Sequence, residues 1–358
     1  MFKRRPVAQL IGRHLASFRK SQRKTICDMT LGLLRKGQVG EAAIARGMLA
    51  LTTVRHCIKR IWRFCSNERI QVRKAWLALL QWVCGQSSSG LVVALDWTDL
   101  GEYKMLAAKV AVCSRAIPVA WTVVRKGQFD EENRSQNTVE ERLIRWLRDA
   151  LEDRRWILVA DRGFRRSALL QRLRRWDIDF VIRASVNTWV RTSRGSGLLG
   201  EVCPKPKRAV CYSNVLYQKE RQVPVNLAVC HREPADEPWY LATNMDLKPT
   251  EIERIYRQRM WIEESFRDAK SNFGLDELWL SEPERMERMM IVVALAMLLS
   301  VLRGLRYRQK HGAKDPQLST KKRGGTLSVF RIGLELLRLR GIPPDLDQVK
   351  LISLDLGT

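Results

Sequence analysis

Leu91-Val-Val-Ala-Leu-Asp96 and Trp156-Ile-Leu-Val-Ala-Asp161 are two runs of five apolar residues that each end in an aspartate. Continuous apolar runs of this length are typical of strands that are buried on both faces of a sheet. Ligands bind at the carboxyl ends of parallel strands in such sheets. If the two strands are neighbours, we expect the two carboxylates to lie close together. The alternative is that each aspartate only caps the element that follows it.

The segments around these runs alternate between strand and helix patterns. Met105–Val112 and Ile117–Val124 are strand candidates, and the short connection between them predicts an antiparallel pair. Val139–Leu151 and Ser167–Trp176 have helical spacing of apolar residues, and Asp179–Ile182 is a further short strand candidate. This alternation predicts the α/β fold class.

The pattern of residues changes after residue 183. Short β-rich pieces separated by Pro and Gly predict a β-strand insertion, which Pro249 and a long helix through about Ser271 follow. The predicted domains are a helical basic DNA-binding domain at 1–88, a catalytic core at 91–183 plus 248–275, the β-strand insertion at 184–247 and a helical C-terminal region at 276–358.

The composition indicates a folded protein with a polyanionic partner. The 358 residues are 45% hydrophobic, which excludes general disorder, and their net charge is +26. Residues 1–90 hold 18 Lys and Arg against three acidic residues. DNA or RNA is the commonest partner of so basic a surface.

Two short helices around a tight turn are predicted at Glu41–Gly47 and Thr52–Trp62, with Thr52 as the N-cap of the second. The second helix carries Arg55, Lys59 and Arg60, which a helix-turn-helix protein would place in a DNA groove. The alternative is a solvated basic helix of an ordinary bundle.

Metal and membrane signals are weak. The eight cysteines include no C-x-x-C pair and there are only four histidines, so the spacing of a zinc site is absent. We interpret the cysteines as reduced core residues of a cytosolic protein. The apolar run Met289–Leu302 is too short to span a bilayer and predicts a buried helix, so no membrane partner is expected.

The helix that begins near Pro249 presents Tyr256, Arg259, Glu263 and Lys270 within an arc of about 60°, at about 100° per residue. Arg259 and Lys270 can hold DNA phosphates, and Tyr256 can donate a hydrogen bond to one. The alternative is a salt-bridged helix face, since Arg259 and Glu263 stand at i, i+4. Glu264 and Asp268 fit only that alternative.

Three carboxylates are the candidate catalytic and metal-binding residues. Asp96 and Asp161 need a cation between them if they lie close together, and Mg²⁺ prefers such hard oxygen ligands. Glu263 can complete the set.

The spacing Tyr256-x2-Arg259-x3-Glu263-x6-Lys270 matches a Y-(2)-R-(3)-E-(6)-K signature without a gap. Together with Asp96-Trp-Thr and Asp161-Arg-Gly-Phe, it makes the chain resemble bacterial insertion-sequence transposases of the "family four" group, which are DDE enzymes. The resemblance implies a ribonuclease-H-like core with a β insertion before the Glu263 helix. It implies two Mg²⁺ ions at the three carboxylates, with Mn²⁺ as a substitute. It also implies that Trp239 stacks on a base flipped out of the transposon end; the alternative is that Trp239 is ordinary core of the insertion.

The implied function is cut-and-paste DNA transposition, in which metal-dependent cleavage and strand transfer at terminal inverted repeats proceed through a DNA hairpin. The implied partners are double-stranded transposon-end and target DNA, with a homodimer in the synaptic complex, in the nucleoid region of a bacterial cytoplasm. One alternative is a ribonuclease-H-like nuclease or resolvase without strand transfer. Another is a catalytically inactive DNA-binding protein derived from a transposase.

Overall fold

The computed structural model of the chain describes residues 4–48, 52–87, 90–129, 135–231, 237–278, 280–312, 327–343 and 346–351. These residues form two compact units. The first unit is drawn from residues up to 88, from 97–143 and from 263 onward, and the second from residues 89–96 and 144–262. The predicted domain boundaries divide the chain differently and stay a prediction.

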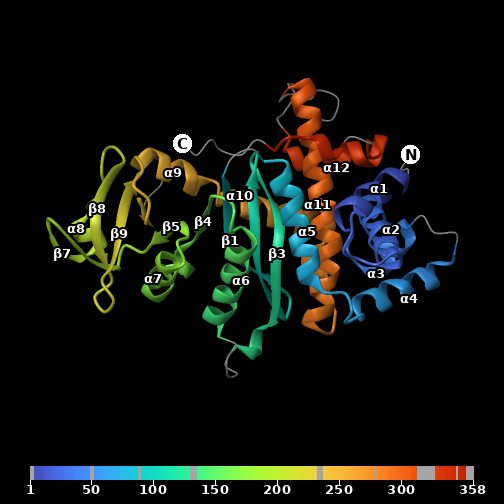
Figure 1. The fold of residues 1–358 in the computed structure, drawn as a ribbon, viewed down its shortest axis with the longest axis horizontal. Coiled ribbons are helices and arrows are strands. Elements are labelled where there is room, and N and C mark those ends of the chain that lie inside the picture. The colour runs from blue at the N-terminus through green and yellow to red at the C-terminus, as the bar shows by residue number, and fades with distance from the viewer. Residues whose placement is uncertain are drawn as a thin grey trace. The chain divides into compact units, whose positions relative to one another are not determined.

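The strands form a mixed sheet (Figure 1). Their bounds are β1 Leu91–Leu100, β2 Tyr103–Val112, β3 Arg115–Arg125, β4 Trp156–Ala160, β5 Asp179–Ala184, β6 Trp189–Thr192, β7 Gly195–Leu198, β8 Val210–Tyr217, β9 Val223–Cys230 and β10 Trp239–Thr243. Their order in the sheet is β3-β2-β1-β4-β5-β10-β9-β8-β6-β7. β4 pairs in parallel with β1 and β5, and β2 pairs antiparallel with β3, as predicted. The predicted α/β class is confirmed in this form.

The helices are α1 Arg4–His14, α2 Lys20–Lys36, α3 Glu41–Gly47, α4 Val54–Cys65, α5 Val72–Gly85, α6 Gln136–Ala150, α7 Ser167–Arg175, α8 Leu199–Val202, α9 Pro249–Arg257, α10 Met260–Phe273, α11 Pro283–His311 and α12 Val329–Arg340. Short 3₁₀ turns lie at Lys126–Gln128, Arg162–Phe164, Leu275–Glu277 and Leu346–Gln348.

The β insertion is continuous with the sheet. β10 pairs antiparallel with β5, with Leu241 opposite Arg183, and β9 continues on its other side. The last four residues of β9, Leu227–Cys230, and the last four of β10, Tyr240–Thr243, are all buried. The insertion therefore shares the core of the second unit.

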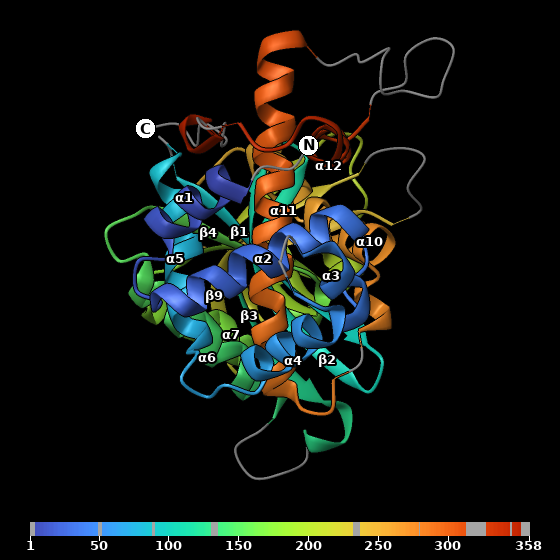
Figure 2. The ribbon, with the colours of Figure 1, turned by 90° about the vertical axis from the view of Figure 1, so that its right-hand side faces the viewer.

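Helix α11 is the centre of the first unit (Figure 2). It packs on α2, α4, α5, α12 and β3. By length and composition α11 is the one helix of the described residues that could cross a membrane, yet 94% of its most apolar 18-residue window is buried inside the protein. The prediction of a buried helix at Met289–Leu302 is confirmed, within a longer helix than the apolar run suggested.

The prediction that the cysteines are reduced core residues is confirmed in part. All eight cysteines are free, and six of them are buried. Cys113 is partly exposed and Cys211 is exposed, so these two are not core residues.

Helices α11 and α12 cross at two glycines. A Cβ atom at Gly304 would lie 1.7 Å from the Val329 carbonyl oxygen, and a Cβ atom at Gly333 would lie 1.7 Å from the Ser300 carbonyl oxygen. No side chain fits where two backbones approach this closely. Because both obstacles are backbone atoms, a substitution must push the helices apart.

We predict that Gly333→Ala lowers the free energy of unfolding by at least about 1–3 kcal/mol, the usual cost of overpacking a core. Gly12→Ala is the matched control, because Gly12 also lies inside a helix but a Cβ there has open space. That control should be neutral or stabilising by up to about 1 kcal/mol. Urea unfolding followed by circular dichroism measures both; equal effects would contradict the close crossing.

The side chain of Glu287 on α11 caps the edge strand β3. Its Oε1 accepts a hydrogen bond of 2.9 Å from the Val123 N–H, and its backbone carbonyl accepts one of 2.9 Å from Trp121 Nε1. Burial raises the pKa of Glu287 from 4.5 to about 7, with the Val123 hydrogen bond opposing the rise. The folded protein therefore holds this proton more tightly than the unfolded chain does.

Because the folded pKa is raised, the contribution of Glu287 to stability is largest below pH 4.5 and falls as the pH rises towards 7. We predict that Glu287→Gln, which cannot ionise, gains about 2–3 kcal/mol relative to the wild type between pH 5 and pH 8. Urea unfolding of both proteins at the two pH values measures this gain. A constant difference between the proteins would refute it.

Candidate active site

The parallel register of β1 and β4 places Asp96 and Asp161 on neighbouring strands. Leu95 is opposite Ala160, and each aspartate is the next residue along its own strand direction. The condition on which their predicted proximity depended, that the strands are neighbours, therefore holds. One detail differs: β1 continues to Leu100, so Asp96 lies within the strand and not after its end.

Asp161 follows β4 directly and caps the next turn. Its Oδ1 accepts a hydrogen bond of 2.8 Å from the Gly163 N–H, at the start of the 3₁₀ turn Arg162–Phe164. Asp161 thus caps the next turn, as the alternative prediction held, but it does so with only one of its two carboxylate oxygens. Asp161 Oδ2 makes no hydrogen bond within the described residues, so this oxygen can accept a ligand.

The long helix predicted from Pro249 is broken. α9 ends at Arg257 and α10 begins at Met260, and between them the Trp261 and Ile262 N–H groups bond to carbonyls three residues back. Gln258 and Arg259 are nevertheless buried, at 3% and 8% exposure. The prediction of uniform helical spacing was therefore wrong, because Tyr256 precedes the break, Arg259 lies in it, and Glu263 and Lys270 follow it.

Arg259 at this break lies beside Asp96. Its Nη1 is 3.7 Å from Asp96 Oδ2, and its Nη2 is 3.4 Å from the Met260 sulfur. The Arg259 guanidinium also lies 5.8 Å from the centre of the Tyr256 ring. Both side chains of the ion pair are largely buried, so little solvent screens the charge. Arg259 thus provides positive charge beside the candidate catalytic aspartate.

Tyr256 and Trp239 pack against each other in the same part of the second unit. Their rings meet edge to face, with centres 5.1 Å apart. Tyr256 is 1% exposed and its hydroxyl makes no hydrogen bond within the described residues. Burial raises the pKa of Tyr256, and the nearby Arg259 guanidinium partly opposes this. Tyr256 is thus buried and Trp239 half-buried, and the DNA contacts predicted for both residues stay predictions.

Glu263 and Lys270 both lie on α10. Seven residues separate them, so they differ by only about 20° around the helix. Both side chains are half-buried, and neighbouring Ile262, Phe266 and Ala269 are buried. These two residues therefore lie along one edge of the buried face of α10.

A buried lysine contacts the buried face of α10. Lys109 on β2 is 2% exposed; its Nζ lies 3.3 Å from the centre of the Phe266 ring and 3.2 Å from Ser265 Oγ. Ser265 in turn donates to the Ala116 carbonyl at 2.7 Å. The signal for this residue in the sequence is a single lysine inside the apolar strand predicted at Met105–Val112.

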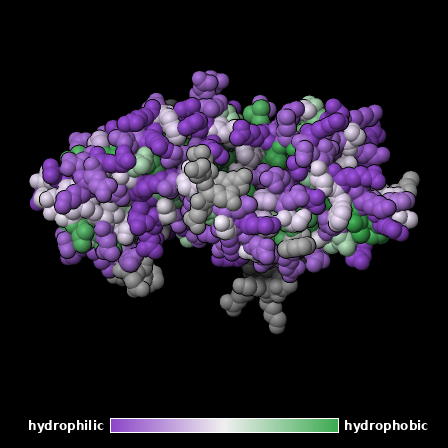
Figure 3. All heavy atoms as spheres, turned by 90° about the horizontal axis from the view of Figure 1, so that it is seen from below, coloured by the Kyte–Doolittle hydropathy of each residue, from purple (hydrophilic) through white to green (hydrophobic). Residues whose placement is uncertain are grey.

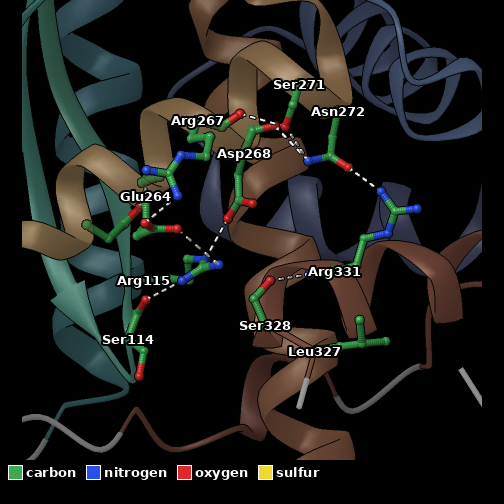
Figure 4. Close-up of polar contacts among 12 residues, drawn as sticks. Ser114, Arg115, Glu264, Arg267, Asp268, Ser271, Asn272, Leu327, Ser328 and Arg331 are labelled. Atoms are coloured by element: carbon green, nitrogen blue, oxygen red, sulfur yellow. Dashed lines mark hydrogen bonds and ion pairs between the residues drawn. The ribbon is translucent and has the colours of Figure 1, made fainter. Parts of the chain in front are cut away.

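The opposite edge of α10 is held by Arg115, the first residue of β3 (Figure 4). Arg115 Nε lies 2.6 Å from Asp268 Oδ2, and Nη2 lies 3.7 Å from Glu264 Oε2. Burial raises the pKa of Asp268, and Arg115 opposes the rise. Glu264 and Asp268 thus serve the salt-bridged alternative on one edge of the helix, while Glu263 lies on the other. No sequence pattern pointed to Arg115, because its partners are about 150 residues away.

The last turn of α10 is tied to other helices of the first unit. Asn272 Oδ1 accepts a hydrogen bond of 2.7 Å from Arg331 on α12, as Figure 4 shows. The Phe273 carbonyl accepts one of 2.7 Å from the Val39 N–H, between α2 and α3. α10 is therefore braced along its length.

The candidate DNA-reading helix α4 presents two of its three predicted residues to solvent. Arg55 and Lys59 are exposed. Arg60 instead pairs with Asp28 on α2, which is 2% exposed and also accepts a 2.6 Å bond from Arg4. Thr53, not Thr52, is the N-cap; Thr52 bonds the His56 ring. The structure thus favours a packing role for Arg60.

Within the part of the chain that the structure describes, no group of three or more His, Cys, Asp and Glu side chains is arranged to hold a metal ion. What it presents is a pair of carboxylates on adjacent strands, which suits part of the oxygen shell of a divalent cation. The participation of Glu263 as a third ligand stays a prediction.

Comparison with known families gives one match, to part of the chain. The family model described as Transposase DDE domain matches residues 123–299, from β3 to α11. The matched segment includes Asp161 and Glu263 and begins after Asp96. No curated protein sequence matches the chain. The match supports a DDE transposase family for the chain; the narrower resemblance to the "family four" group rests on the signature residues alone.

We predict that Arg115→Met lowers the free energy of unfolding by about 1.5–3 kcal/mol, as expected for hydrogen bonds to a charged, largely buried partner. Arg148→Met is the control, because Arg148 pairs with Asp149 at the surface and such pairs are worth at most about 1 kcal/mol. In a double-mutant cycle with Asp268→Asn, urea unfolding should show that most of the Arg115 effect is shared with Asp268. Additive effects would contradict the pairing.

Proposed function

We propose that this protein is a DNA transposase that cleaves the ends of an insertion sequence and joins them to target DNA. The single observation that carries the proposal is the match of residues 123–299 to the transposase DDE domain. The neighbouring positions of Asp96 and Asp161 on parallel strands add independent support, because phosphoryl-transfer sites use such carboxylate pairs.

The strand order supports a ribonuclease-H-like core. Antiparallel β3 and β2 stand beside β1, which is followed by parallel β4 and β5. The insertion strands lie beyond β5 and return to α9 just before the signature residues. This layout is the one that the resemblance to the "family four" group implies.

The chemistry that we propose needs two Mg²⁺ ions, or Mn²⁺ in their place, held by Asp96, Asp161 and Glu263. When bound, such ions lower the pKa of the attacking water or 3′-hydroxyl and stabilise the leaving oxygen of an in-line displacement. The carboxylates bind and orient, and Asp161 retains its capping bond to Gly163 through one oxygen.

The basic and aromatic residues hold the DNA. Arg259, which lies beside Asp96, and Lys270 bind phosphates on either side of the scissile bond. The Tyr256 hydroxyl is buried in the structure without DNA and donates to a phosphate oxygen once DNA binding exposes it. Trp239 meets the flipped base with the part of its ring that Tyr256 leaves uncovered.

The reaction that we propose proceeds by cut and paste through a DNA hairpin at the terminal inverted repeats, in a synaptic homodimer in the bacterial cytoplasm. The N-terminal helices recognise the repeats, with Arg55 and Lys59 of α4 contacting DNA. The excess of positive charge in residues 1–90 supports this division of labour.

We predict that Asp96→Asn, Asp161→Asn and Glu263→Gln each reduce Mg²⁺-dependent cleavage more than about 100-fold, since even the loss of a group that only hydrogen-bonds to a metal ligand costs about 10- to 100-fold. Gel shifts of the same DNA should be unchanged. Glu264→Gln is the control, because Glu264 neighbours Glu263 but pairs with Arg115. The substrate is a plasmid that carries the inverted repeats flanking the coding region.

A variant that cleaves at the wild-type rate removes its residue from the site. A joining assay with a pre-cleaved end then separates the reaction types. Cleavage without joining by the wild-type protein would identify a nuclease or resolvase. Binding without either reaction would identify an inactive DNA-binding protein.

A further inference from the structure

A cavity of about 260 Å³ lies in the first unit beside α4, outside the candidate active site. Its walls are the C-terminal end of α4, the first residue of α3 and the segment that leads into α11. Pockets for drug-sized ligands have about 300–1,000 Å³, so this cavity suits a single flat ring system. Cys65 and Leu280, both buried, form apolar parts of its lining.

Trp62 stands at this cavity with its ring exposed. It is 56% accessible and is the one aromatic residue among the exposed large hydrophobic side chains of the described residues. Hydrophilic residues cover most of the face shown in Figure 3, and the hydrophobic ones there form small separate patches. Because more than half of its surface is accessible, the Trp62 ring is open to a ligand.

The orientation of the Trp62 ring is set within the protein. Its Nε1 donates a 2.7 Å hydrogen bond to Glu41 Oε2, which uses the only polar atom of the indole. The wall that carries Trp62 is also fixed, because the buried Arg288 of α11 donates a 2.7 Å bond to the Cys65 carbonyl. The ring can therefore stack on a ligand without first losing much conformational freedom.

The same face of α4 is basic. At about 100° per residue, Arg55 lies about 20° and Lys59 about 60° from Trp62 around the helix axis, and both are exposed. Arg55 and Trp62 are about 10 Å apart along the axis. On the far side of α4 Arg60 is bound to Asp28, so the exposed face is the one available to a ligand. A polyanion that follows this face meets two cations and then the indole.

We infer that the Trp62 cavity binds a single unstacked nucleobase of DNA whose phosphates lie along Arg55 and Lys59. This site is distinct from the one that Trp239 would form for a flipped base, because it is built on the N-terminal helices α3 and α4. The charged groups at the cavity match a base edge: the Glu41 carboxylate accepts from amino or imino N–H groups, and Arg285 donates to ring nitrogens or carbonyl oxygens. The inference rests on the proposed function only in that the chain binds DNA.

Base stacking and phosphate binding respond differently to salt, and this difference provides the test. An aromatic ring contributes about 1–3 kcal/mol per base, whereas each phosphate contact adds to the slope of affinity against salt. Binding of the full chain is measured by fluorescence anisotropy in EDTA, so that no metal-dependent cleavage enters. The probes are a fluorescein-labelled single-stranded oligonucleotide of mixed sequence and the same strand in a full duplex.

Trp62→Ala should weaken binding of the single strand about 5- to 150-fold, with less effect on the duplex and no change in the salt slope. Trp62→Phe should restore most of the affinity. Lys59→Met should weaken binding of both probes and lower the slope by about one phosphate. Because the Trp62 ring is exposed, the Tm of Trp62→Ala should stay near that of the wild type.

Four results would overturn the inference. Equal losses on single strand and duplex would make Trp62 a backbone contact, and an unchanged affinity would remove it from the DNA surface. A loss of self-association in Trp62→Ala without a loss of DNA affinity would make the cavity an interface between copies of this chain. A wild-type protein that binds neither probe would refute DNA binding itself, whereas inactive Asp161→Asn with intact binding leaves this site standing.

Discussion

The parallel pairing of β1 with β4 is the constraint on which the candidate site depends. The pairing Leu95–Ala160 leaves Asp96 and Asp161 as the next residues on adjacent strands. Two carboxylates placed this way repel each other unless positive charge lies nearby. Arg259 supplies such charge, with its Nη1 3.7 Å from Asp96 Oδ2. It lies in the break between α9 and α10. The broken helix is thus part of the same electrostatic arrangement.

Helix α10 has a second set of constraints within the first unit. Lys109 lies beneath its buried face, Arg115 holds one edge, and its last turn bonds to Val39 and Arg331. The residues that hold it come from β2, β3, α12 and the segment between α2 and α3. A helix fixed at so many points has little freedom to rotate about its axis. The direction in which Glu263 and Lys270 project is therefore set by residues that themselves play no part in the proposed chemistry.

Much of the fold was predictable because local patterns carried it. The strand at Trp156–Ala160 and the helix at Glu41–Gly47 have the bounds that their sequence patterns predicted. The break after Arg257 was missed, because no Gly or Pro marks it and the apolar spacing continues through it. Of the candidate DNA-binding residues on α4, Arg60 was indistinguishable from Lys59 by spacing, and only the packing of α2 shows that it pairs with Asp28.

The sequence by itself determined which segments become strands and helices, the excess of positive charge and the identity of the candidate carboxylates. These properties depend on residue type and on spacing over a few positions, and both can be read along the chain. The tertiary structure alone decided which charges meet. Arg115 pairs with Asp268 across 153 positions, and the indole of Trp62 borders a cavity closed by residues more than 200 positions away. Such contacts depend on how packed elements bring distant side chains together, and no local pattern encodes that.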